Sequence, residues 1–241
     1  MASNVKVRLF AEGLGSLLLA ATVIGSGIMA QQLAQGNVAV ALLANTGATV
    51  AVLLVLIALL GPVSGAHFNP AVSFVMAMRN QLPWREMVLY ALVQVVGCCL
   101  GALLAHSMFV LPLWQFSTHA RNGFAQLLAE FIATFGLLLV VLGHRRKDDA
   151  PWMVAAWIGA AYWFTSSTSF ANPAITIARA LSDTFAGIRP TDVAPFIAAQ
   201  IAGALGAIAV ANFLFVECEP KQSKVEAPHP IGVQESRLRD L

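Results

Sequence analysis

Charged residues are scarce in this sequence. Asp, Glu, Lys and Arg make up 11% of its 241 residues, whereas hydrophobic residues make up 58%. Soluble domains usually carry about 25% charged residues. A chain with so few charges cannot cover a water-exposed surface, so it is expected to be an integral membrane protein in contact with the lipid bilayer. The net charge is only +2 and no long basic run occurs, which argues against a nucleic-acid partner.

Cysteines and catalytic motifs are also few. The three cysteines are Cys98, Cys99 and Cys218, and their spacing does not suit a metal site. Cys98 and Cys99 lie inside an apolar run, where we expect them to be small packing residues. No Ser/His/Asp arrangement, metal cluster or phosphate-binding loop occurs at a useful spacing. We therefore expect no catalytic residue, no metal and no cofactor, and the chain is not expected to be an enzyme.

Long hydrophobic runs are abundant. Six of them approach or exceed the ~20 residues that a membrane-spanning helix needs. They lie at about 9–31, 39–60, 87–110, 124–143, 151–168 and 194–216. The fold class predicted is an all-α membrane protein, formed by one domain over residues 1–241. The tail 219–241 mixes charges with prolines and is expected to be a flexible end.

Two Asn-Pro-Ala triplets lie in the intervals 61–86 and 169–193, between the second and third and the fifth and sixth runs. They are Asn69-Pro70-Ala71 and Asn172-Pro173-Ala174. Asn is a good N-cap and Pro is tolerated at the first helical position, so each triplet predicts the start of a helix. The apolar stretch that follows covers only about half a membrane thickness. Such a helix is re-entrant and must line a cavity or be buried in protein.

The two halves of the chain repeat each other, at about 8–110 and 124–216. Ala11-Glu12 matches Ala129-Glu130, and Gln94 followed by Gly97 matches Gln200 followed by Gly203. Each half has three spans, so the second half enters the membrane from the opposite side and the repeat is inverted. Inverted repeats place the functional site near the midplane. We therefore expect the side-chain amides of Asn69 and Asn172 to face a pore there.

Basic residues are distributed unevenly among the predicted loops. Of the fourteen, only Arg121, Arg179 and Arg189 fall on the side opposite the two termini. Cytoplasmic loops carry the excess of Lys and Arg. Both termini are therefore predicted to be cytoplasmic, and the location is the cell (inner) membrane.

Two Asn-Pro-Ala half-helices in an inverted repeat, with a Glu in the first span of each half and Ser64-Gly-Ala-His67 before the first triplet, resemble the aquaporin family. The resemblance implies a homotetramer with one pore per protomer, through which small neutral solutes pass. It also implies that Glu12 and Glu130 support the pore-lining loops through hydrogen bonds, although solute binding stays an alternative. His67 either lines the pore or supports the loop.

The selectivity filter departs from the family's usual pattern. Most members have Arg directly after the second triplet, whereas this chain has Ile175. Counting by the family's spacing gives a filter of four positions, Thr49, Ala160, Ser169 and Ile175. They are small or medium in size and uncharged, so we expect a wide filter. Arg179 lies one helical turn after Ile175 and could reach back to the filter; alternatively it caps the half-helix or pairs with Asp183.

The segments 172–179 and 183–190 resemble a bacterial aquaglyceroporin-like subgroup associated with arsenic resistance. This resemblance implies passage of arsenite and other metalloid acids, methylated arsenicals and glycerol-like polyols, besides water. One alternative is a strict water channel whose outer mouth is closed by Arg179. A secondary transporter and a structural protein with a plugged pore are further alternatives.

Overall fold

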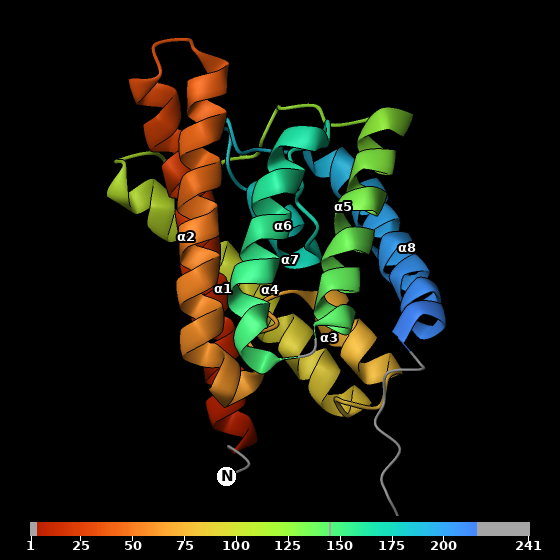
Figure 1. The fold of residues 1–241 in the computed structure, drawn as a ribbon. Coiled ribbons are helices and arrows are strands. Elements are labelled where there is room, and N and C mark those ends of the chain that lie inside the picture. Colours follow the sequence, from red (N-terminus) through yellow and green to blue (C-terminus); the bar gives the residue numbers. More distant parts are fainter. Residues whose placement is uncertain (1–3, 145, 216–241) are drawn as a thin grey trace, which may run out of the picture.

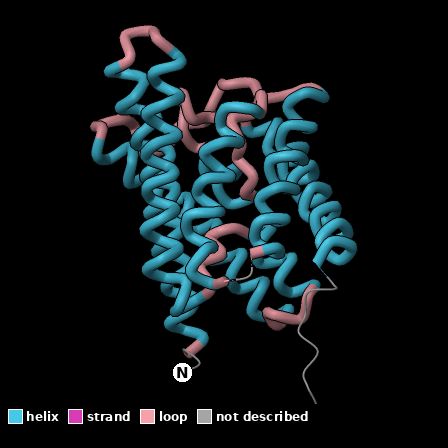
Figure 2. Tube along the Cα trace, viewed as in Figure 1, coloured by secondary structure: helices cyan, strands magenta, loops and turns pink. Residues whose placement is uncertain are grey.

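The computed structural model describes residues 4–144 and 146–215, and these residues form helices and loops without a strand (Figures 1 and 2). The all-α class predicted from the hydrophobic runs is confirmed. The predicted flexible tail 219–241 and Cys218 lie outside the described residues. The helices are α1 (Val5–Leu33), α2 (Val38–Ser64), α3 (Pro70–Met78), α4 (Trp84–Met108), α5 (Phe124–Gly143), the 3-10 helix η1 (Lys147–Asp149), α6 (Ala150–Phe164), α7 (Pro173–Arg179) and α8 (Pro190–Phe215).

Six helices are long, and five of them (α1, α2, α4, α5 and α8) are long and apolar enough to span a membrane by themselves. The sixth, α6, has 15 residues. It packs against α2 and α5 and runs alongside them (Figure 1), so it is the remaining crossing. The span predicted to end at residue 168 ends at Phe164, because the backbone becomes extended at Thr165.

The two halves pack in the same way. In the first half α1 lies against α4 and α2, and in the second half α5 lies against α8 and α6. Glycines allow the close approach in both: a Cβ on Gly97 would lie 2.4 Å from the Gly13 carbonyl oxygen, and one on Gly203 would lie 2.3 Å from the Phe131 carbonyl oxygen. The matched contacts agree with the predicted repeat.

The two short helices α3 and α7 begin at the predicted prolines. Each has an extended Asn as N-cap and Pro in its first turn. In Figure 1, α7 lies in the upper half of the molecule and α3 in the lower half, surrounded by the long helices. The start of α1 and the end of α8 lie on the same side, as an even number of crossings requires (Figure 1).

Candidate functional site

Asn69 and Asn172 hold the first turns of the two half-helices. The Oδ1 atom of Asn69 accepts a hydrogen bond from Ala71 N at 2.9 Å. The Oδ1 atom of Asn172 accepts from Ala174 N at 2.9 Å and from Ile175 N at 3.3 Å. These bonds satisfy backbone N–H groups that a helix start leaves unpaired. Both side-chain oxygens are therefore committed to their own half-helix.

The amide nitrogens of the same residues cross to the other half. Asn69 Nδ2 donates to the Ala171 carbonyl at 2.7 Å, and Asn172 Nδ2 donates to the Phe68 carbonyl at 2.8 Å. An amide NH2 carries two protons, so one N–H of each remains for a solute. Both asparagines line the central cavity. The two amides were predicted to be free to face a pore. Each instead uses one N–H in a hydrogen bond to the other half and has one N–H left for a solute.

Glu12 and Glu130 bind the loops that precede the two triplets. Glu12, fully buried in α1, accepts from the backbone N–H of His67 at 3.0 Å and of Phe68 at 2.7 Å. It also accepts from Ser64 Oγ at 2.7 Å and from Gln94 Nε2 at 2.8 Å. These hydrogen bonds attach α1 to the loop before the first triplet, which is the loop support that the family resemblance implies.

Glu130, fully buried in α5, makes the equivalent bonds in the second half. It accepts from Phe170 N at 2.8 Å, from Ala171 N at 2.9 Å and from Gln200 Nε2 at 2.6 Å. Ser169 and Ala171 have positive φ angles of 49° and 47°, a conformation that costs of order 1–3 kcal/mol for a non-glycine residue. The hydrogen bonds of the Glu130 carboxylate thus help to offset the cost of this backbone conformation.

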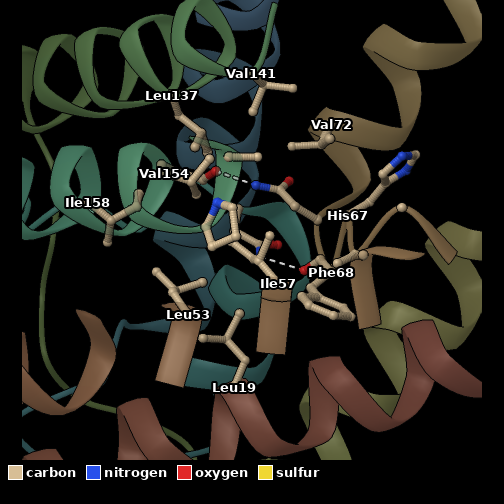
Figure 3. Close-up of a pocket in the computed structure, with 18 of the residues that line it drawn as sticks. Leu19, Leu53, Ile57, His67, Phe68, Val72, Leu137, Val141, Val154 and Ile158 are labelled. Carbon is tan, nitrogen blue, oxygen red and sulfur yellow. Dashed lines mark hydrogen bonds between the residues drawn. The ribbon is translucent and has the colours of Figure 1, made fainter. Parts of the chain in front are cut away.

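The cavity lies between the long helices and passes both asparagines, with a volume of about 970 Å³. Thr49, Tyr162 and Arg179 line one end, and His144 and Asp148 line the other. Figure 3 shows that apolar side chains surround the junction of the half-helices. They are Leu19, Leu53, Ile57, Val72, Leu137, Val141, Val154 and Ile158. A channel of this kind has an apolar wall with a few polar groups at the junction.

His67 combines the two roles predicted for it. It lines the cavity, while its Nδ1 lies 3.0 Å from Ser73 Oγ and its ring packs edge-on against buried Tyr90. The predicted alternative of a plugged pore finds no support in the nearby phenylalanines. The Phe68 ring packs on Gly15 of α1, and the Phe170 ring packs on Phe196 of α8, at 5.3 Å between centroids.

Of the predicted filter positions, Thr49, Ser169, Ile175 and Arg179 line the cavity. Ala160 does not: it is exposed on the opposite side of α6, and its assignment to the filter is wrong. Tyr162, two residues later, lines the cavity in its place. Its hydroxyl lies 3.2 Å from Thr49 Oγ1. The spacing of four that leads from Val154 to Ile158 continues to Tyr162, and this helical face was the available signal.

Arg179 is 2% exposed and reaches, from the last turn of α7, the end of the cavity that Thr49 and Tyr162 line. Its Nε donates to the Ala186 carbonyl, and its guanidinium carbon lies 3.4 Å from the centroid of the Phe170 ring. The alternative pairing with Asp183 is wrong, because Asp183 accepts from the backbone N–H of Thr118 at 2.8 Å and from its hydroxyl at 3.0 Å. Arg179 therefore adds a charge that the four filter positions lack.

Comparison with known proteins agrees with this architecture. Residues 2–170 match the sequence profile of the family described as Major intrinsic protein. The chain is 49% identical over 215 residues to Aquaglyceroporin AqpS of Rhizobium meliloti, covering 88% of this chain and 92% of that protein. It is 31% identical over 234 residues to the Probable glycerol uptake facilitator protein of Thermotoga maritima, covering 85% and 98%. The solved aquaglyceroporin from Plasmodium falciparum has the same fold, with a TM-score of 0.62 and 22% identity over 87% of this chain and 95% of that one.

Proposed function

This chain belongs to the major intrinsic protein family, and we propose that it conducts glycerol-sized uncharged solutes through the cavity described above. It is a passive membrane channel for small uncharged solutes and not an enzyme. The proposed solutes are glycerol-like polyols, arsenite and related neutral metalloid acids, methylated arsenicals and water. The names of the two relatives, an aquaglyceroporin and a probable glycerol uptake facilitator, support the polyols.

The single observation that carries the proposal is the lining of the cavity. Aliphatic side chains cover much of its wall, and one N–H each of Asn69 and Asn172 is available at the junction. A polyol has a carbon skeleton on one side and hydroxyl groups on the other, so it suits such a wall. Pore diameter and lining donors set selectivity in channels of this type.

The composition of the outer end supports a wide filter. By the resemblance to the aquaporin family, Ile175 takes the position of a filter Arg, and Thr49 and Ser169 are small. Arsenite is neutral at pH 7 and similar in size to glycerol, so the same opening suits both. Arg179 favours a second candidate, a water-only channel in which its guanidinium closes the outer end.

We further propose a homotetramer in the cell (inner) membrane with both termini cytoplasmic. The tetramer rests on the resemblance to the aquaporin family. The orientation rests on the positive-inside rule. It is supported by Lys6, Arg8, Arg79 and Arg85, which belong to the side where α1 begins, whereas Arg121 and Arg189 belong to the other side.

Stopped-flow light scattering on purified protein in liposomes tests the solute class. Glycerol and arsenite should enter far faster than into empty vesicles, and water-only permeation would favour the second candidate. Ile175→Arg should reduce glycerol flux more than water flux, because a longer side chain narrows the filter. Ile175→Leu, which conserves volume, is the control and should keep the ratio of the two. Equal loss of water and glycerol in Ile175→Arg would contradict the wide filter.

A further inference from the structure

The outer end of the cavity contains hydrogen-bond donors that no protein group uses. Arg179 donates through Nε, but its two terminal nitrogens have no acceptor among the residues that the structure describes. The side chain is 2% exposed and lines the cavity, so these nitrogens face the space through which solutes pass. Buried N–H groups without an acceptor are unfavourable, and a ligand that accepts from the terminal nitrogens would stabilise the buried guanidinium.

Positive charge is in excess in this region, because the two cations Arg121 and Arg179 share the charge of one buried carboxylate, Glu130. Arg121 also contacts the Phe170 ring, and its guanidinium carbon lies 5.0 Å from the ring centroid. It donates to the carbonyls of Gly187 at 2.8 Å and Ser167 at 3.0 Å, so it has neutral partners. Burial lowers the pKa of Arg121 to about 10, which leaves it a cation at pH 7.

The carboxylates of this region make their hydrogen bonds and ion pairs with groups other than Arg179. Glu130 accepts three hydrogen bonds from protein groups and does not line the cavity. Asp192 forms an ion pair with Arg189 at 3.0 Å. Asp148 is the acidic residue among the described lining residues, and it belongs to η1 at the other end of the cavity. No carboxylate oxygen lies within ion-pair distance of Arg179 in the part of the chain that the structure describes.

We propose that the outer end of the cavity is a binding site for a small monovalent oxyanion, held by the terminal nitrogens of Arg179. Planar oxyanions such as formate and nitrate match the fork of a guanidinium, which binds two oxygens at once. An anion bound there occupies the path of neutral solutes, so it inhibits their flux reversibly. This inference rests on the proposed function in one respect, because the flux of neutral solutes is used to measure anion binding.

The test measures glycerol and water flux into liposomes that contain the purified protein. Sodium nitrate or sodium formate is present on both sides, and sodium gluconate, a larger anion, replaces it at equal ionic strength in the control. Nitrate and formate should inhibit flux in a saturable way, whereas gluconate should not. Arg179→Gln should raise the half-inhibiting concentration by at least about tenfold, because it removes the charge and the fork. Arg179→Lys should retain weaker inhibition.

A further variant separates a site from general electrostatics. Arg189→Gln removes one positive charge from the same side without touching the cavity lining and should leave inhibition unchanged. The proposal is wrong if nitrate and formate do not inhibit the unmodified protein, or if Arg179→Gln and Arg189→Gln respond alike. Failure of the proposed function would differ, because glycerol would then not enter even without nitrate, and water flux would still report inhibition.

Discussion

Glu130 offers a sharp test of whether the buried carboxylates hold the pore loops. Its Oε1 accepts from Phe170 N, and its Oε2 accepts from Ala171 N and Gln200 Nε2. Glu130→Gln keeps the shape, but its new NH2 group must face one set of these donors. The orientation that keeps both bonds of Gln200 Nε2, to residue 130 and to Thr176 Oγ1, points the new NH2 at Phe170 N, so one backbone N–H loses its acceptor. A buried donor without a partner costs about 1–3 kcal/mol.

Glu130→Ala removes both acceptors. Two buried N–H groups then lack a partner, and the same figure per group gives about 2–6 kcal/mol. For a chain of this length, 1 kcal/mol corresponds to a Tm shift of roughly 2–4 °C. Thermal unfolding in detergent should therefore show a loss of about 2–12 °C for Glu130→Gln, on the same conversion, and about twice that for Glu130→Ala. Glycerol flux should fall in the same order, because Ser169 belongs to the loop that is released.

Thr134 provides a matched control, one turn further along α5. It is fully buried, and its hydroxyl has no hydrogen-bond partner among the described residues. Thr134→Val keeps the shape and removes no hydrogen bond that the structure shows, so its Tm should stay close to that of the unmodified protein. Equal Tm losses in Thr134→Val and Glu130→Gln would refute the reasoning, as would a loss in Glu130→Ala no larger than that in Glu130→Gln.

Two further predictions concern the outer end. Tyr162→Ala removes a ring from the cavity wall and should raise the uptake of erythritol relative to glycerol severalfold, whereas Ala160→Val, on the far side of α6, should leave that ratio unchanged; equal ratios in both variants would show that the ring does not limit solute size. In the loop between α4 and α5, burial and the nearby charges of Arg121 and Arg179 lower the pKa of His119. Its folded-state pKa lies below the unfolded value near 6.5, so the unfolded state binds more protons and stability falls as pH drops below that value. His119→Gln should lose less Tm between pH 7.5 and pH 5.5 than the unmodified protein, and parallel curves would count against this shift.

The half-helices could be predicted because their signals are local. An Asn N-cap followed by Pro describes a helix start within three residues, and both α3 and α7 begin there. The repeat could also be predicted, because Glu12 and Glu130 occupy equivalent positions in the two halves of the sequence. What these signals have in common is that each depends on residue type and order and not on the path of a loop.

The filter residue on α6 could not be found by counting residues back from Asn172, and the reason is physical. The count from Asn172 back to Ala160 passes through the loop 165–171, where Thr168, Ser169 and Ala171 have positive φ angles. None of them is glycine, so their residue types do not predict a positive φ angle. The same loop ends α6 at Phe164, earlier than the hydrophobic run indicated. An error of two residues on a helix turns the side chain to the opposite face.

The junction of the two halves explains why the pore favours neutral solutes over cations. Each asparagine oxygen accepts from its own half-helix, and one N–H of each amide donates to a carbonyl of the other half. Turning either amide over would break bonds on both sides, so the orientation is fixed. The groups left for the pore are therefore N–H donors, and the asparagines present no oxygen that could replace the water around a cation. Arg179 at the outer end reinforces this polarity, since it too offers donors only. A passing solute must supply acceptors, which hydroxyl oxygens do without a net charge.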